Sequence, residues 1–222
     1  MRHERVINVC FHGIGRPARE LEEGEAPYWV PRGLYLDVLD LVAEDPRVRI
    51  SFDDSNSSDV EIALPGLLER GLDATFFVLA GRLDAPGSLS VGDVRALTTH
   101  GMRIGSHGMD HTPWRGLPEA AMVRELVEAR ALLAEAAGAP VDEAALPLGR
   151  YDRRLLDRAR TLGYTRVHTS DRRWARPTDW LQPRFSVRGQ DTVDSVRRDV
   201  LTRASPARRA ERWAVTGLKR LR

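Results

Sequence analysis

The sequence predicts a single-domain α/β fold with a parallel, barrel-like sheet. Short apolar runs alternate with helical patterns along most of the chain, which is typical of repeated βα units. Polar residues of the kind found in active sites follow several of the apolar runs, and in parallel α/β folds such residues gather at the carboxyl ends of the strands. The length of 222 residues is enough for one substantial core.

The expected elements follow from hydrophobic periodicity and from turn and cap residues. A first strand is expected at 6–11, followed by a loop at 16–33 that is rich in Pro, Gly and Glu. Within this loop, Tyr28 and Trp29 either form a wall of a substrate groove or pin the loop to the barrel. Further strands are expected at 47–52, 73–79, 102–105, 143–146 and 165–169, and helices at 33–43, 60–70 (with a kink or a later start at Pro65), 90–100, from about 117 onward, and 152–162.

Composition excludes several classes of protein. The net charge is +2 with abundant charges of both signs, so no nucleic-acid partner is implied. The one cysteine, Cys10, excludes a disulfide framework and is expected to be buried in the first strand. No signal peptide and no apolar stretch of about 20 residues is visible, so a cytoplasmic location is expected.

The chain divides into a main domain at 1–190 and a basic helical extension at 191–222. Such a basic amphipathic segment either packs on the domain with a solvated face or lies on an anionic membrane surface. The sequence leaves both interpretations open, and it says nothing about the oligomeric state.

The candidate chemistry lies in two segments, Asp53-Asp54 and His107 to His111. Adjacent aspartates at a strand end point in different directions, so one can ligate a metal while the other faces a bound water. Histidines at i and i+4 share one face of a helical turn and can reach a single ion. Two histidines and one carboxylate are a common catalytic zinc shell, and the second carboxylate can serve as general base.

Each segment also has a plainer interpretation. An Asp-Asp pair after a strand is commonly a turn or a helix cap. Two histidines four residues apart are commonly a solvated helical face. The two segments together, each at the end of an apolar run, favour the metal site and a hydrolase that acts on an amide or ester.

These segments resemble the motifs of the polysaccharide deacetylases, the NodB-homology family also called carbohydrate esterase family 4. Ser51 to Asp54 resembles the family's T-F-D-D motif, and His107 to His111 resembles its H-[S/T]-x-x-H motif with Gly108 at the second place. Between them, Gly71 to Val78 and His100 to His107 resemble two further family segments. The resemblance covers about 51–148 and implies a distorted (β/α)7 barrel.

The resemblance also implies roles for individual residues. Asp53 would be the general base, and Asp54, His107 and His111 would bind a divalent metal, usually Zn²⁺, although Co²⁺ and Ni²⁺ suit such a shell too. The backbone N–H of Leu148 would contribute to an oxyanion hole at the third motif, where a backbone donor does not depend on the side chain.

Two departures from the family pattern concern the third motif and the general acid. Ala145 stands where an arginine is common, and Arg184, in a segment that resembles a late family strand at 183–187, is a candidate to pair with Asp53 instead. No histidine follows His168, so the usual L-x-H motif is absent. By resemblance to the exopolysaccharide branch, His12 is the first candidate for the general acid. His168, in the strand expected at 165–169, is the second.

Two further residues are expected near the site. Asp171 would hydrogen-bond to a histidine or a base of the site and orient it, with a loop carboxylate paired with Arg172 as the alternative. Trp114 would cover the metal or contact a sugar face.

The expected function is metal-dependent removal of an N-acetyl group from an N-acetylated sugar, with a polysaccharide, an oligosaccharide and a lipid-linked glycan as the alternative substrates. A catalytically impaired relative that binds glycan is one alternative, supported by the altered third motif and the missing L-x-H. A nucleotide-sugar glycosyltransferase that uses Asp53 and Asp54 to hold Mg²⁺ or Mn²⁺ is another, but it leaves both histidines unexplained.

Overall fold

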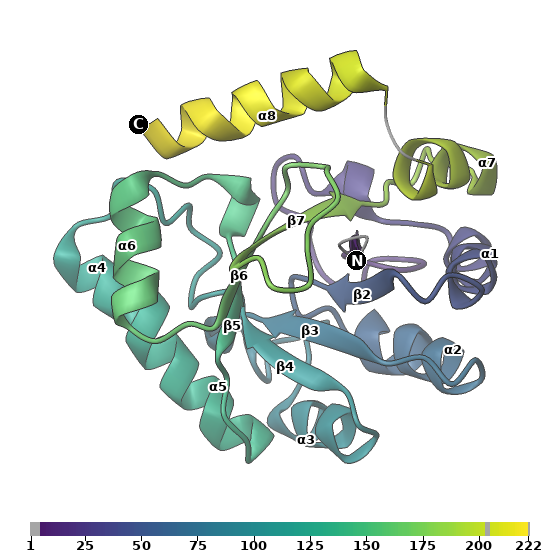
Figure 1. The fold of residues 1–222 in the computed structure, drawn as a ribbon. Helices are drawn as coiled ribbons and strands as arrows, with labels where there is room; N and C mark the ends of the chain where they lie inside the picture. Colours follow the sequence, from purple (N-terminus) through teal and green to yellow (C-terminus); the bar gives the residue numbers. More distant parts are fainter. Residues whose placement is uncertain (1–4, 203–204, 222) are drawn as a thin grey trace.

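Seven parallel strands close into a barrel whose order in space follows their order in the chain (Figure 1). The computed structural model describes residues 5–202 and 205–221, apart from the side chains at positions 208, 209, 212, 213, 215, 220 and 221. The first strand pairs with both the second and the last, which closes the barrel. The strands are β1 (Ile7–Phe11), β2 (Val48–Phe52), β3 (Ala74–Val78), β4 (Arg103–Ser106), β5 (Glu143–Ala145), β6 (Arg166–Thr169) and β7 (Leu181–Ser186).

Helices cover the outside of the barrel (Figure 1). The main α-helices are α1 (Arg32–Ala43), α2 (Leu64–Leu68), α3 (Val91–Thr99), α4 (Glu119–Val123), α5 (Ala129–Ala137), α6 (Arg153–Thr161), α7 (Val193–Val196) and α8 (Pro206–Leu221). Short 3-10 or π-helical turns lie at η1 (Ala26–Tyr28), η2 (Asp59–Ala63), η3 (Ala80–Arg82), η4 (Arg124–Glu128), η5 (Pro147–Gly149) and η6 (Arg197–Leu201). The predicted barrel is confirmed, and the helix expected at 60–70 is divided near Pro65, where η2 passes into α2.

Alternation along the strands explains the two faces of the barrel wall. Phe11, Phe52 and Phe76 come from three neighbouring strands and stack in series, with ring centroids 5.6 and 4.6 Å apart. Tyr35 of α1 packs edge-on against Phe11 at 5.2 Å. The intervening positions carry polar side chains such as Arg184, so the helix-covered face is apolar and the enclosed face is polar.

The seam between β4 and β5 is the thinnest in the barrel. Only one pair of residues, Ser106 and Ala144, is in register there, whereas β1 and β2 share five such pairs. The metal-ligand candidate His107 follows Ser106, and Ala145 follows Ala144, so the seam lies directly beneath the candidate site.

The first part of the C-terminal extension packs on the domain. Val196 and Val200 are buried in the main core, and the Trp174 indole donates a hydrogen bond to the Val200 carbonyl. Farther along, Lys219 of α8 donates to Asp171 and to the Gly149 carbonyl, at 2.8 and 3.2 Å. No helix in the described part of the chain is long and apolar enough to span a membrane. Contact with a membrane surface stays a prediction.

Candidate metal centre and active site

Asp53 and Asp54 lie at the carboxyl end of β2 and are almost completely buried. The Asp53 N–H still donates to the Phe11 carbonyl, which prolongs the β1–β2 pairing by one step. The chain then turns through a left-handed conformation, with φ of 74° at Asp54 and 60° at Ser55. Such conformations are costly for residues other than glycine and cluster at functional sites, where they re-aim side chains.

The segment from His107 to His111 is a loop, so the expected helical turn is wrong. Gly108 has a φ of +88° and His111 a φ of 57°, which breaks any helix. The buried Glu125 carboxylate accepts hydrogen bonds from the backbone N–H groups of Met109 and Asp110, at 2.7 and 3.2 Å, and holds the loop. A Cβ at position 108 would lie 2.2 Å from a Glu125 oxygen, so this arrangement requires the glycine.

The two imidazoles nevertheless converge on Asp54. The Nε2 atoms of His107 and His111 lie 3.4 and 3.3 Å from the same Asp54 oxygen, Oδ1. The other ring nitrogens are held from behind, because His107 Nδ1 bonds the Ala145 carbonyl at 2.9 Å and His111 Nδ1 bonds Glu22 at 2.5 Å. These contacts fix both tautomers with Nε2 directed at Asp54.

This trio fits a divalent cation. Asp54 Oδ1 is buried and has no hydrogen-bond partner, which is costly unless a ligand satisfies it. One ligand atom from each of the three residues lies within 4.8 Å of the others. Burial opposes ionisation of Asp54, but His107, His12 and His111 outweigh it and hold the pKa of that carboxyl well below its usual range. A charged carboxylate beside two imidazoles is a suitable donor set for Zn²⁺.

Asp53 is held by Arg184 of β7. The guanidinium donates from Nη1 to Oδ1 at 2.7 Å and from Nη2 to Oδ2 at 2.6 Å, and both side chains are buried. Burial raises the pKa of Asp53, but the charges of Arg184 and His107 outweigh it and bring the pKa to about 2. Arg184 on β7 thus pairs with Asp53, as predicted. The arginine that is common in the family would instead stand at position 145, on β5.

A cavity of about 310 Å³ opens over these residues. The loop at 16–33 forms one side of it, and the segment around the third motif forms the other. The lining residues are His12, Glu22, Glu23, Gly24, Glu25, Tyr28, Asp53, Asp54, His107, His111, Leu146, Leu148, Gly149, Arg150, Ser170, Arg184 and Ser186.

Comparison with known proteins identifies the family. The family model for polysaccharide deacetylases matches residues 41–167, more than half of the chain. The chain belongs to the polysaccharide deacetylase family. A Bacillus subtilis protein named as a polysaccharide deacetylase, YxkH, is 27% identical over 117 residues, which are 53% of this chain and 42% of the relative. The chain therefore spans less than half the length of that relative.

Solved structures share the fold of this deacetylase-family chain. The Streptococcus pyogenes deacetylase PplD in complex with acetate superimposes with a TM-score of 0.75 at 17% identity, covering 88% of this chain and 98% of that one. A Bacillus anthracis protein described as a polysaccharide deacetylase gives a TM-score of 0.77 at 18% identity, covering 88% and 69%. At these identities the likeness establishes the NodB-type barrel alone.

The two candidates for a general acid in this deacetylase-family site lie in different places. His12 lines the cavity, stacks on Tyr28 at 4.8 Å and has a buried Nδ1 without a hydrogen-bond partner. Its burial lowers its pKa. His168 lines a different cavity and bonds Glu143 at 2.7 Å, so the expectation that it serves as a second candidate acid is wrong. His168 lies before the end of β6, and Ser170, two residues later in the chain, lines the active-site cavity.

The wall formed by the 16–33 loop uses its two aromatic residues differently. Tyr28 lines the cavity against His12. Trp29 packs over Gly13, where any Cβ would lie 2.2 Å from the indole, and its Nε1 donates to Glu25 at 3.3 Å. Tyr28 thus forms a wall and Trp29 anchors the loop, so both interpretations hold, each for one residue.

Trp114 and Asp171, which were expected near the site, contact other groups. Trp114 is fully buried and donates from Nε1 to Glu125 at 3.0 Å, so the expected contact with a sugar is wrong. Asp171 accepts hydrogen bonds from Tyr151, Thr169 and Lys219, at 2.7, 2.9 and 2.8 Å. Asp171 therefore anchors the chain after the third motif to β6 and α8, in place of orienting a histidine or a base.

The third motif, at Pro147 to Gly149, turns through two residues in the left-handed conformation. Leu148 lies in η5 with a φ of 54° and borders the cavity with an exposed side chain. Gly149 follows with a φ of +61°, and a Cβ there would lie 1.9 Å from the Ser170 hydroxyl. The conformation thus depends on the glycine and leaves the Leu148 side chain without a fixed role.

Sequence reasoning missed Glu22 and Glu125. Glu22 lies in a loop with several other acidic residues, so nothing in the sequence singles it out as the partner of His111. Glu125 lies in a helix rich in charged residues and looks like part of a solvated face. The glycine at position 108, where the family has a hydroxyl residue, was the one signal that pointed to a close neighbour.

Proposed function

We propose that this protein is a metal-dependent hydrolase that removes the acetyl group from an N-acetylated carbohydrate and releases acetate and the free amine. The observation that carries the proposal is the convergence of His107 and His111 on the unpartnered oxygen of Asp54, with the ionised Asp53 alongside. Membership of the polysaccharide deacetylase family supports the carbohydrate class.

Asp54, His107 and His111 would hold the cation, and Zn²⁺ suits two imidazoles and one carboxylate, with Co²⁺ and Ni²⁺ as alternatives. When bound, the cation polarises the acetyl carbonyl and lowers the pKa of water. All remaining steps depend on the side chains and amides of this chain.

Asp53 accepts a proton from the attacking water, whose oxygen bonds to the acyl carbon. Arg184 keeps this carboxylate ionised and oriented before the reaction. The Leu148 N–H donates to the developing oxyanion. The C–N bond then breaks as the amine nitrogen takes up the proton that Asp53 removed from water, and His12 is the group in the cavity that we assign to deliver it.

Acetate release from N-acetylglucosamine oligomers, with bound metal measured on the same samples, tests the proposal. Asp53→Asn should abolish release while retaining metal, whereas His107→Ala should lose both. His12→Asn should lower release strongly and His168→Asn should not. Metal-dependent glycan binding without any acetate from the wild-type protein would favour the impaired, glycan-binding alternative.

A further inference from the structure

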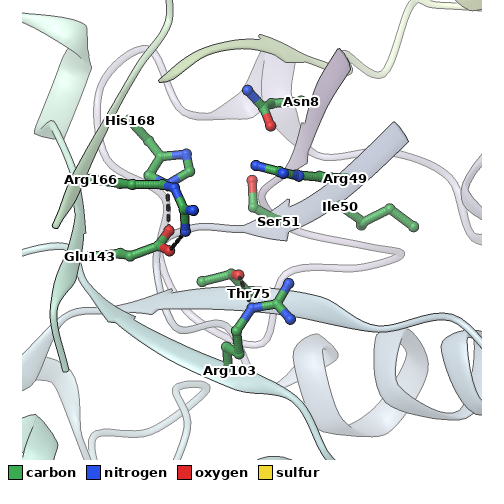
Figure 2. A pocket seen from close by; sticks show the side chains of 9 residues that line it. All are labelled: Asn8, Arg49, Ile50, Ser51, Thr75, Arg103, Glu143, Arg166 and His168. Atoms are coloured by element: carbon green, nitrogen blue, oxygen red, sulfur yellow. Dashed lines mark hydrogen bonds and ion pairs between the residues drawn. The ribbon is translucent and has the colours of Figure 1, made fainter. Parts of the chain in front are cut away.

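A second cavity, of about 260 Å³, lies in the barrel at the opposite end from the candidate active site (Figure 2). Its walls come from residues at or near the start of six strands, β1 to β6, and from the inward positions above them. The lining residues are Asn8, Arg49, Ile50, Ser51, Thr75, Arg103, Glu143, Arg166 and His168. None of these residues has a role in the proposed reaction.

Three arginines from alternate strands surround this N-terminal cavity. Arg49 comes from β2, Arg103 from β4 and Arg166 from β6, and Figure 2 shows their side chains around one space. One carboxylate, Glu143 of β5, lies among them. The lining therefore carries three guanidinium groups against a single negative charge.

The arginines differ in how their charges are compensated. Arg166 is paired with Glu143 at 2.6 Å, and Arg103 is paired with the exposed Asp73 at 2.9 Å. Arg49 has no hydrogen-bond or ion-pair partner among the described residues. Partial burial and then the charge of Arg166 lower the pKa of Arg49, while the charges of Glu143 and Asp73 oppose the shift.

Neutral polar groups complete the lining. His168 bonds Glu143 through Nε2, and its Nδ1 is buried without a partner. Burial lowers the pKa of His168, so the ring is neutral, donates from Nε2–H and leaves Nδ1 as an acceptor. Asn8, Ser51 and Thr75 contribute further polar side chains. The cavity thus offers the uncompensated guanidinium of Arg49 as a donor and the unpartnered Nδ1 of His168 as an acceptor.

We propose that the N-terminal cavity binds a phosphate-class oxyanion, either free phosphate or the phosphoryl group of a small molecule. Arginine guanidinium groups match the geometry of phosphate oxygens and form charge-assisted hydrogen bonds with them. A monoprotonated phosphate also carries one O–H, which can donate to the His168 acceptor. An ionised simple carboxylate has no such hydroxyl and would leave the His168 acceptor without a partner.

The site is separate from the catalytic one. Ser51 lines the N-terminal cavity and accepts a hydrogen bond from Arg184 at 3.1 Å, and Arg184 holds Asp53 on its other side. One layer of side chains therefore divides the two cavities. A phosphate bound at the metal and a phosphate bound at Arg49 can be distinguished by substitution.

Calorimetric titration of inorganic phosphate into the metal-loaded protein, at constant ionic strength, tests the proposal. Wild type should bind about one phosphate saturably. Arg49→Gln should weaken binding at least about tenfold, because it removes one charge-assisted interaction. Arg95→Gln, at an exposed arginine on α3, should leave binding unchanged. Asp54→Ala, which removes a metal ligand, should retain it. Glycerol 3-phosphate in place of phosphate distinguishes a bound metabolite from the free ion.

Arg103→Gln provides a second variant at an exposed position if Arg49→Gln folds poorly, and it should weaken binding in the same direction. Three outcomes would overturn the proposal: no saturable binding up to about 10 mM phosphate, equal affinity in wild type and both arginine variants, or loss of binding in Asp54→Ala alone.

Discussion

Arg184 and Asp53 form a buried, two-pronged ion pair that joins β7 to the end of β2. The planar guanidinium matches both carboxylate oxygens, so it fixes the orientation of Asp53 as well as its charge. Removing either partner would leave an uncompensated buried charge.

Arg184→Lys should lower the rate of acetate release by about 10- to 100-fold with bound metal unchanged, because a single ammonium cannot hold both oxygens of Asp53. Steady-state kinetics with metal analysis measures this. Arg176→Lys, at an exposed arginine, is the matched control. Full activity in Arg184→Lys would show that the paired geometry is dispensable.

Glu22→Gln should weaken metal affinity by about 10- to 100-fold, because the carboxylate that orients His111 would become a neutral amide. Chelator competition measures the affinity directly. Glu23→Gln removes a neighbouring charge from the wall of the same cavity and should leave the affinity nearly unchanged. Equal losses in the two variants would assign the effect to general charge.

Glu125→Ala should destabilise the protein by about 2–4 kcal/mol, because several buried donors would lose their acceptor. The loop N–H groups, Thr112 and the Trp114 indole all donate to this one carboxylate. Urea unfolding with and without metal measures the loss. Glu128→Ala, at an exposed residue three positions later, should change stability little.

Glu143 should make stability depend on pH at the acid end. Burial raises its pKa, but His168 and Arg166 outweigh burial and bring it to about 2, below the usual value. A carboxyl with a depressed folded-state pKa contributes stability that is present above its unfolded pKa, near 4.5, and is lost as pH falls toward 2.

Urea unfolding at pH 7 and pH 3 should therefore show a smaller acid-induced loss of stability in Glu143→Gln than in wild type. Glu128→Gln is again the control, since its carboxylate is exposed. An identical loss in Glu143→Gln and wild type would mean that this ion pair is not formed in solution.

The fold was predictable because the strand periodicity and the family motifs agree with each other. The converging positions of Asp54 and the two histidines followed from the same motifs. The helical spacing of the two histidines predicted a helical turn, and this prediction was wrong. The left-handed Gly108 and the distant Glu125 set a loop conformation there.

The errors at His168 and Trp114 have a common cause. Residue type and strand assignment place a side chain inside the barrel or next to a motif, but not at a given height along the axis. His168 is enclosed by the barrel yet faces the other cavity, and Trp114 follows the metal loop yet points into the core. Contacts between residues far apart in sequence decide such positions.

The thin seam between β4 and β5 has a consequence for how the barrel responds to metal. The hydrogen bond from His107 to the Ala145 carbonyl bridges this seam, beside its single in-register pair. A cation that immobilised His107 would strengthen the link between β4 and β5, the pair of strands with the fewest in-register residues. Amide exchange in Ser106 and Ala144 should then slow on metal loading more than exchange between β1 and β2, where the ladder is already complete.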